Sequence, residues 1–158
     1  MKNKTVDYYN DNAEEYSNKT LYLDLKEKYN KFTKGIKFGG KILDVGCGSG
    51  RDLIAFKSLG YDVIGIDASI KLVDIAKENS KADVFNKDFH QIDWKQEFDG
   101  VWCMASLLHL QKEELITVLN KLSISMKEGA SFYASFKNGN GESFDDKDRF
   151  FSYYNKKN

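Results

Sequence analysis

The chain carries an apolar run that ends at three closely spaced glycines, Ile42-Leu43-Asp44-Val45-Gly46-Cys47-Gly48-Ser49-Gly50-Arg51-Asp52. The run has the length of a buried β-strand, and residues 51–59 have the pattern of a helix that Gly60 closes as a C-terminal cap. Glycines between a strand and a helix let the backbone turn sharply and let a ligand approach main-chain atoms. Such a loop also fits an ordinary tight turn, so its surroundings decide between the two interpretations.

The alternation of strands and helices continues on both sides of this loop. Apolar periodicity predicts one or two short helices within 5–34, and then helices and strands in turn. The strands are expected at 41–45, 61–66, 82–85, 98–103 and 131–136, and the later helices over 70–79 and over 115–126, ending near Gly129. Short connections of this kind imply right-handed βαβ units and a parallel sheet covered on both faces. In such sheets ligands bind at the carboxyl ends of the strands.

Length and charge restrict the class of protein. The 158 residues suit one domain, and 24 basic against 24 acidic residues give zero net charge, which argues against a dedicated nucleic-acid binder. Two cysteines and two histidines at unrelated spacings predict neither a disulfide framework nor a metal site. The longest apolar stretch, 101–110, is too short to span a bilayer, and the N-terminus lacks the apolar core of a signal peptide. We therefore expect a cytoplasmic protein without a membrane partner.

Two acidic residues restrict the kinds of ligand that the glycine loop could bind. Asp44 lies two residues before the first glycine, and Asp67 closes the second strand, where its carboxylate could accept both hydroxyls of a ribose. Both acids would repel a pyrophosphate and suit a cationic nucleoside without phosphate. In a dinucleotide fingerprint the third glycine stands one place later, where this chain has Arg51. A nicotinamide-dependent oxidoreductase is thereby disfavoured, although Asp67 could also be a solvated strand end.

Four segments, in chain order, resemble the motifs of the class I S-adenosylmethionine-dependent methyltransferases. They are residues 42–52, Gly65–Ser69, Asn86–Phe89 and Phe98–His109. Residues 8–16 and 148–154 are similar to the lead-in and the tail of the small bacterial members that act on small molecules. The resemblance implies an α/β fold, a Rossmann-like three-layer α/β/α sandwich with a mainly parallel sheet of about five strands. Residues 1–158 would form one domain, with an N-terminal helical lid segment (1–38), a cofactor-binding core (39–136) and a tail (137–158).

The chain departs from the family pattern at its C-terminal side. The full family fold has seven strands, whereas the 22 residues after Phe136 leave too little chain for another helix and the usual closing antiparallel hairpin. The domain is thus expected to be C-terminally truncated relative to the family fold. This truncation puts catalytic activity in doubt more than cofactor binding, because the cofactor motifs lie earlier in the chain. The alternative function is a catalytically weak S-adenosylmethionine-binding module that needs a partner chain.

The resemblance also assigns residues to the cofactor. Gly46 and Cys47 would line its methionine portion, Asp67 would hold the ribose, and Ala68 would lie against the adenine. Asp88 and the Phe89 amide would read the adenine edge, and the Cys103 carbonyl would face the methionine. The expected cofactor residues are therefore Asp44, Gly46, Cys47, Gly48, Asp67, Ala68, Asp88, Phe89 and Cys103. Asp88 could instead be a turn residue, and Cys47 either a reactive thiol or a small residue that the turn requires.

The expected reaction is methyl transfer to an unidentified small molecule by in-line displacement at the sulfonium methyl, which leaves S-adenosylhomocysteine. The chain has no proline and hence no N/D-P-P-Y/F motif of the nucleic-acid amino-methylating enzymes. His109 is the candidate general base, or else a polar residue near the pocket or at a helix start. The acceptor side and lid would come from Tyr9, Tyr16, Lys137 and Arg149, unless Arg149 pairs with Asp145, Asp146 or Asp148.

The fifth predicted strand leaves an open edge. Residues 131–136 carry no charge, proline or glycine that would protect unpaired backbone groups. We expect something to cover this edge. The aromatic tail could fold back over it, or a homodimer could form through the edges of two fifth strands, which is the alternative we favour.

Overall fold

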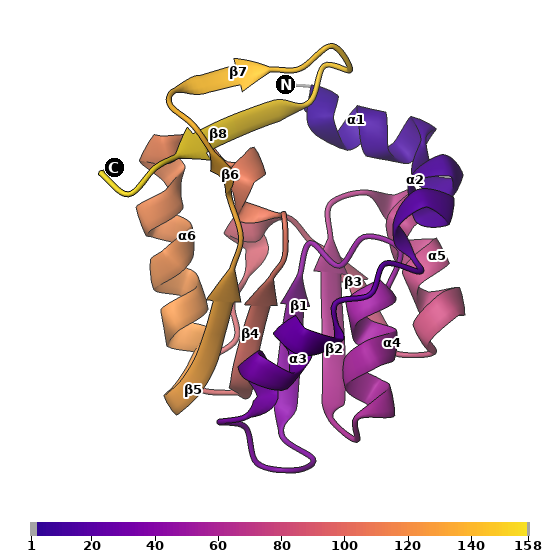
Figure 1. The fold of residues 1–158 in the computed structure, drawn as a ribbon, viewed down its shortest axis with the longest axis vertical. Coiled ribbons are helices and arrows are strands. Elements are labelled where there is room, and N and C mark those ends of the chain that lie inside the picture. The colour runs from indigo at the N-terminus through magenta and orange to yellow at the C-terminus, as the bar shows by residue number, and fades with distance from the viewer. Residues whose placement is uncertain (1–2, 158) are drawn as a thin grey trace.

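The structure, a computed structural model that describes residues 3–157, is an α/β sandwich (Figure 1). Its helices are α1 (Lys4–Asp11), α2 (Ala13–Thr20), α3 (Lys26–Thr33), α4 (Arg51–Ser58), α5 (Ile70–Ser80) and α6 (Lys112–Ser125), with short 3-10 turns η1 (Phe89–Gln91) and η2 (Leu107–His109). The main strands are β1 (Lys41–Val45), β2 (Asp62–Asp67), β3 (Asp83–Asn86), β4 (Phe98–Cys103) and β5 (Met126–Ala134).

The five main strands are all parallel and lie in the order β3-β2-β1-β4-β5. The chain moves outward from β1 to β3 and then returns to the other side of β1 with β4. The carboxyl ends of β1 and β4 therefore form the switch point, where the connections diverge and leave room for a ligand. The predicted Rossmann-like sandwich with about five parallel strands is confirmed.

Both faces of the sheet are covered, as the continuous apolar strands predict. One face packs against α3, α4 and α5 through a cluster that includes Phe32, Phe56, Val73 and Trp102. The opposite face packs against α6 through a cluster that includes Leu43, Val101, Val118 and Leu122. Within the N-terminal segment, α3 thus belongs to the core, whereas α1 and α2 lie over the carboxyl ends of the strands (Figure 1).

The boundary between α6 and β5 differs from the prediction. The helix ends at Ser125 rather than near Gly129, and β5 begins at the next residue. Gly129 has a φ of +77° inside β5, next to a register shift between the pairs at Phe98 and Gly100. The glycine thus permits a β-bulge rather than a helix cap, and sequence alone does not separate these two uses of a positive φ.

The tail also departs from the expectation that it is too short for a hairpin. It forms β6 (Lys137–Asn138), β7 (Glu142–Phe144) and β8 (Phe150–Tyr154), in a small sheet of order β6-β8-β7 whose β7–β8 pair is antiparallel. The Asp145 carboxylate closes the turn by accepting from the backbone N–H groups of Lys147 and Arg149 and from the Arg149 guanidinium. This sheet lies above the carboxyl ends of the main strands, near α1, and does not join β5 (Figure 1).

Across residues 3–157, no helix combines the length and the apolar character that crossing a membrane requires.

Candidate functional site

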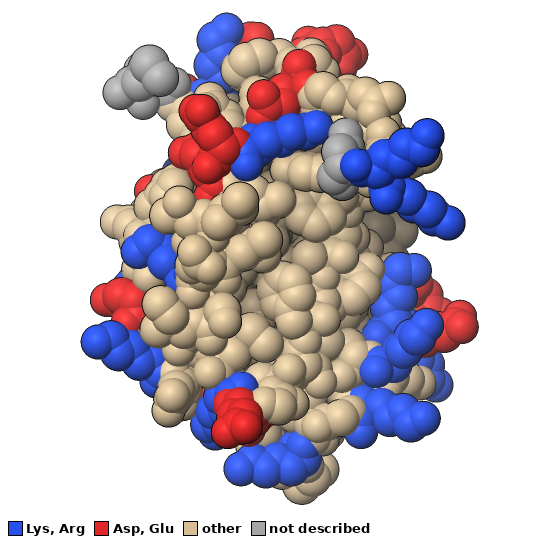
Figure 2. Space-filling view, turned by 90° about the vertical axis from the view of Figure 1, so that its left-hand side faces the viewer, with Lys and Arg blue, Asp and Glu red and all other residues tan. Residues whose placement is uncertain are grey.

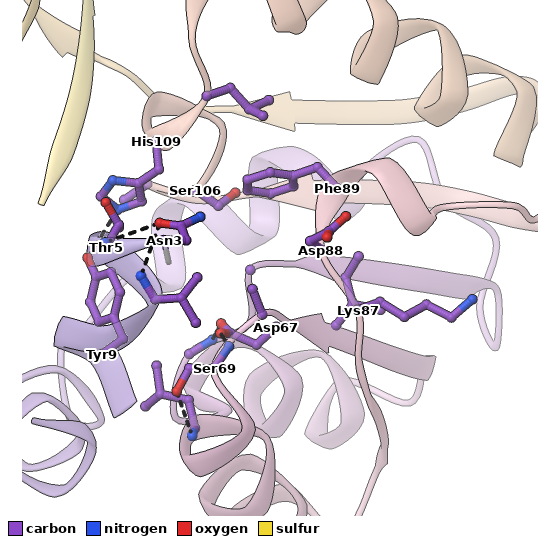
Figure 3. Close-up of a pocket in the computed structure, with 18 of the residues that line it drawn as sticks. Asn3, Thr5, Tyr9, Asp67, Ser69, Lys87, Asp88, Phe89, Ser106 and His109 are labelled. Carbon is purple, nitrogen blue, oxygen red and sulfur yellow. Dashed lines mark hydrogen bonds between the residues drawn. The ribbon is translucent and has the colours of Figure 1, made fainter. Parts of the chain in front are cut away.

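A cavity of about 240 Å³ opens at the carboxyl ends of the main strands, beneath α1. Predicted cofactor residues that line it are Gly46, Gly48, Asp67, Ala68, Asp88 and Phe89, together with the predicted lid and base residues Tyr9, Tyr16 and His109. Asp88, Phe89 and Lys87 lie on one side, and Tyr9, Thr5 and His109 lie on the other (Figure 3). The structure thus brings together, around one hollow, residues that are more than 100 positions apart in the chain, such as Thr5 and His109.

The glycine loop leaves space at the floor of the cavity. Gly46 has a φ of +72°, and a Cβ there would lie 2.5 Å from the Ser106 Cβ. Gly48 has a φ of +55°, and a Cβ there would meet the Tyr16 ring at 3.2 Å. Both positions therefore need glycine for backbone conformation and for space, which supports the ligand interpretation of the loop beside the tight-turn one.

Asp67 is fixed at the wall of the cavity by two backbone groups. Its Oδ2 accepts from the Gly48 N–H and its Oδ1 accepts from the Ser69 N–H, both at 2.9 Å. Burial raises the pKa of the Asp67 carboxyl, and these two hydrogen bonds counteract the rise. A carboxylate offers about four lone-pair positions, so Asp67 can accept two further hydrogen bonds from a ligand.

The other side of the cavity is built on η1. Asp88 caps this turn by accepting from the His90 N–H at 2.8 Å, so the turn-residue interpretation of Asp88 also applies. His90, which also lines the cavity, contacts Glu114 through Nε2 and Oε1 at 3.0 Å. The Phe89 ring points into the hollow (Figure 3) and provides an apolar surface for a planar group.

His109 is bound at both ring nitrogens. Its Nδ1 lies 2.7 Å from the Phe150 carbonyl oxygen, and its Nε2 lies 3.1 Å from the Tyr9 hydroxyl. Because a carbonyl only accepts, Nδ1 carries the proton of the neutral ring and Nε2 accepts from Tyr9. Burial lowers the pKa of His109 to about 4, and burial also raises the pKa of Tyr9. The ring is therefore neutral at pH 7, with its free lone pair toward Tyr9.

The lowered pKa of His109 makes stability depend on pH. Between its ordinary pKa of about 6.5 and about 4, the unfolded chain binds one more proton at this site than the folded chain. The free energy of unfolding should therefore fall as the pH drops through this window, and the protonation of His109 alone should account for up to about 3 kcal/mol of that fall. The change to test is His109→Gln, which keeps a donor for Phe150 and should flatten the slope. Urea unfolding of both proteins from pH 7 to 4 measures it, and parallel curves would contradict the assignment.

Two buried polar atoms near the loop have no hydrogen-bond partner among the described residues, Asp44 Oδ2 and Ser106 Oγ. Ser106 lines the cavity, while Asp44 is 1% exposed and its pKa is raised by burial and by Asp52. Buried polar atoms are normally satisfied, so the Ser106 hydroxyl has capacity for a group that enters the cavity.

Beneath the loop, Asp52 connects three elements in a way that the sequence did not reveal. Its carboxylate accepts from the Tyr29 hydroxyl, from the Arg51 guanidinium at 2.8 and 3.1 Å, and from the Trp102 Nε1 at 2.9 Å. Asp52 is 4% exposed and Trp102 is fully buried. Asp52 therefore joins α3, α4 and β4 directly under the glycine turn.

The two cysteines do not line the cavity. Cys47 packs against Gly65, and Cys103 lies in the core. Burial raises the pKa of both thiols, so neither is a thiolate at neutral pH and the small-residue interpretation of Cys47 applies. The Cys103 carbonyl accepts from the Ser135 N–H at 3.2 Å, and Cys103 is fully buried.

Lys137 and Arg149 are not among the residues that line the cavity, although Arg149 interacts with the hydroxyl of the lining residue Tyr9. The Arg149 guanidinium donates to Asp145 at 2.6 and 2.9 Å and lies over the rings of Tyr8 and Phe151. The salt-bridge alternative for Arg149 is thus observed, with Asp145 as its partner. The Lys137 ammonium lies 3.7 Å from the centre of the Phe151 ring.

Several lining residues were not among the site residues predicted from the sequence. The cavity is also lined by Asn3, Thr5, Val6, Ile66, Ser69, Leu72, Lys87, Ala105, Ser106, Leu110 and Glu114. Asn3 and Ser69 also cap α1 and α5, which is a purely local signal. Asn3 and Ser69 reach the cavity because of how α1 and α5 pack, and a capping pattern in the sequence does not predict helix packing.

Curated proteins resemble this chain over part of their length. The magnesium-protoporphyrin O-methyltransferase of Rhodobacter capsulatus is 33% identical over 89 residues, which are 53% of this chain and 40% of that protein. The ubiquinone biosynthesis O-methyltransferase of Nitrobacter winogradskyi is 30% identical over 111 residues, which are 67% of this chain and 42% of that protein. The matches therefore span less than half of either relative.

Solved structures share the fold over more of the chain. The 1,6-didemethyltoxoflavin-N1-methyltransferase of Burkholderia thailandensis superposes with a TM-score of 0.74 and 17% identity, covering 96% of this chain and 69% of that chain. The magnesium protoporphyrin IX methyltransferase of Synechocystis gives a TM-score of 0.65 and 22% identity, covering 81% and 73%. At these identities the likeness concerns the fold. Residues 42–129, more than half of this chain, match the sequence profile of a family described as the methyltransferase domain, and the chain belongs to that family.

Proposed function

We propose that this domain binds S-adenosylmethionine in the cavity and transfers its methyl group to a small molecule, with S-adenosylhomocysteine as the product. The observation that carries the proposal is the Asp67 carboxylate, held by Gly48 and Ser69 with lone pairs to spare beside a glycine loop. The Burkholderia enzyme was crystallised with S-adenosylhomocysteine and the Synechocystis enzyme with S-adenosylmethionine, which supports the same ligand here.

The residues present fit this cofactor. Asp67 would accept the ribose hydroxyls, while Ala68, Asp88 and Phe89 would surround the adenine. The unpartnered Ser106 hydroxyl lies beside Gly46, on the side proposed for the methionine portion. No Lys or Arg lines the cavity within residues 3–157 except Lys87, which pairs with Asp93 at 2.9 Å. The site therefore suits a cationic ligand without phosphate better than a dinucleotide.

When bound, the cofactor supplies a methyl group on a sulfonium, which is activated for attack without further chemistry by the protein. The protein's part is to position the acceptor and exclude water, and positioning can contribute about 7–11 kcal/mol. Tyr9 and Tyr16 meet edge-to-face at 5.2 Å over the loop, where they can shield the reacting atoms. His109 can hold an acceptor proton at Nε2, a contribution of about 10²–10⁴-fold where deprotonation is needed.

Calorimetric titration tests this proposal. The domain should bind S-adenosylmethionine and S-adenosylhomocysteine at one site and should not bind NAD. Binding of NAD alone would favour the oxidoreductase alternative. If both sulfur compounds bind but a panel of small acceptors gives no turnover, the module that needs a partner chain becomes the better account.

The lid is a separate part of the proposal. We expect α1, α2 and the 137–154 tail to gain hydrogen-exchange protection when S-adenosylhomocysteine binds, because Tyr9 and Tyr16 line the cavity and Phe150 of the tail holds the lining residue His109. The exchange experiment compares the free and bound protein, with α4 outside the cavity as an internal reference. Equal protection of these segments in both states would remove the lid role.

We further propose that two copies pair through β5. No strand within residues 3–157 pairs with the outer edge of β5, since the tail pairs only within its own small sheet. The tail therefore does not pair with this edge as a strand. The side chains of Phe132 in β5 and of Phe136 just after it are exposed, at 44% and 37%. Figure 2 shows the corresponding side of the molecule as a broad uncharged area with charged side chains mainly around its margin. Such an area has no charge that would repel a second copy.

Light scattering coupled to size exclusion should thus report a dimer. Phe132→Lys should convert it to a monomer, since Phe132 is exposed whereas its neighbour Tyr133 stacks on Trp102 at 4.1 Å. The matched control is Ile70→Lys, which places the same charge at an exposed apolar position on α5. A wild-type monomer over a wide concentration range would defeat the dimer.

A further inference from the structure

We propose that Tyr9 is a catalytic residue that passes the acceptor's proton to His109, so the methyl acceptor carries an uncharged O–H or N–H group, as in a phenol or a ring N–H, rather than a carboxylate. This inference rests on the proposed function and deepens it by naming the acceptor class.

The direction of the relay is set by the tail. The Phe150 carbonyl binds the His109 Nδ1–H, and the Phe150 N–H donates in turn to Thr5 Oγ1 at 2.9 Å. Ser152 ties the same strand to the Leu110 carbonyl at 2.6 Å, and the Phe151 ring lies 4.8 Å from the His109 ring. His109 is therefore held in one orientation and one tautomer, with Nε2 as its only acceptor.

Tyr9 stands between Nε2 and the cavity. Its ring meets the rings of Tyr8, Tyr16 and His109 at 5.3, 5.2 and 5.6 Å, which restricts its rotation. Its hydroxyl donates to Nε2 and keeps lone pairs on an oxygen at the cavity wall (Figure 3). The Arg149 guanidinium also interacts with this oxygen and occupies one of its lone pairs, so an acceptor X–H can donate to the other.

The surroundings of Tyr9 favour an uncharged acceptor. The side of the cavity opposite Asp88, here called the acceptor side, is lined by Asn3, Thr5, Val6, Tyr9 and His109. None of these five is a cation, because His109 is neutral. Neither neighbouring cation is among the residues that line the cavity. Arg149 pairs with Asp145 and interacts with the Tyr9 hydroxyl, and Lys137 lies over the Phe151 ring, so both are already engaged. A carboxylate would therefore lose its hydration without gaining a counter-charge, whereas an X–H group finds a proton acceptor.

The proposed step balances in atoms and charge. The X–H bond breaks and its proton goes to Tyr9 Oη, while the Tyr9 proton moves to His109 Nε2. The electron pair on X forms the bond to the methyl group, and the S–CH₃ bond breaks with its pair left on sulfur. One positive charge leaves sulfur as one forms on the imidazole, so the total charge of the cavity does not change. The proton returns through Tyr9 to water after the product leaves.

The electrostatics of the two groups agree with these roles. Burial favours neutral His109, with Arg149 and Lys137 also opposing its protonation and Asp145 favouring it. Burial likewise keeps Tyr9 protonated, with Tyr16 and Asp67 acting in the same sense and Arg149 against it. The relay therefore starts with the proton on Tyr9 and the lone pair on His109, as the step requires.

Nitrogen-15 NMR of the two histidines tests the relay without turnover. The full chain is saturated with S-adenosylhomocysteine, the His109 signals are identified by their loss in His109→Gln, and phenol and benzoate are added as probes of equal ring size. Phenol should shift the His109 Nε2 resonance and benzoate should not. In Tyr9→Phe the affinity for phenol should fall at least tenfold, whereas Tyr8→Phe, the neighbouring control, should leave it unchanged.

Each contrary result has its own meaning. A benzoate shift equal to that of phenol, no shift with either probe, or a Tyr9→Phe protein that binds phenol like the wild type would overturn the relay. Failure of S-adenosylhomocysteine to saturate the protein, seen by calorimetry before any probe is added, would instead count against the proposed function.

Discussion

Asp67→Ala is expected to weaken S-adenosylmethionine binding by about 10- to 100-fold. Hydrogen bonds to a charged group contribute about 1.5–3 kcal/mol, and each 1.4 kcal/mol is tenfold in affinity. The substitution also releases the Gly48 and Ser69 N–H groups that the carboxylate holds at 2.9 Å, so the glycine loop loses an anchor. Calorimetric titration of the folded variant, verified by circular dichroism, measures the loss.

Asp62→Ala is the matched control for this prediction. Asp62 lies at the opposite end of the same strand and is exposed, so its removal should change the affinity less than twofold. Asp67→Asn, which keeps one acceptor oxygen, should give an intermediate affinity. If Asp67→Ala binds as tightly as the wild type, Asp67 does not hold the ligand.

Asp52→Ala is expected to lower the free energy of unfolding by about 3–5 kcal/mol, the usual result of removing one partner of a buried ion pair. The loss would leave the buried Trp102 Nε1 and Tyr29 hydroxyl without an acceptor, and would leave Arg51, whose side chain is 17% exposed, without its counter-charge. For a chain of this length each kcal/mol corresponds to roughly 2–4 °C in Tm. Urea and thermal unfolding measure the change.

The comparison variant is Asp93→Ala. Asp93 also pairs with a cation, Lys87, but its side chain is 76% exposed, so its loss should lower the free energy of unfolding far less than the loss of Asp52. A similar small cost for Asp52→Ala would show that the network beneath the loop contributes little to stability.

The sequence predicted those parts of the site that a local pattern encodes. The glycine spacing and Asp67 at the end of a strand identify one wall of the cavity, because a parallel sheet places consecutive strand ends together. Asp88 and Phe89 follow from the next strand in the same way. Apolar periodicity gave the positions of the strand ends, and the family resemblance assigned Asp88 and Phe89 there to the cofactor.

Contacts that depend on the tail were not predictable. His109 and Phe150 are 41 residues apart, and they meet only because Asp145 closes a hairpin that composition did not indicate. Arg149 shows the same limit, since its pairing with a nearby acid was one alternative and the geometry of the turn selects it. Gly129 was misinterpreted because a helix cap and a bulge both use a positive φ.

The most direct test of the proposed site is a crystal structure of this chain with S-adenosylhomocysteine. We predict both ribose hydroxyls within hydrogen-bond distance of the Asp67 carboxylate, the adenine beside Phe89 and Asp88, and the sulfur on the side of the cavity where Tyr9 and His109 meet. A ligand bound elsewhere, or bound in this cavity with its ribose away from Asp67, would contradict the account.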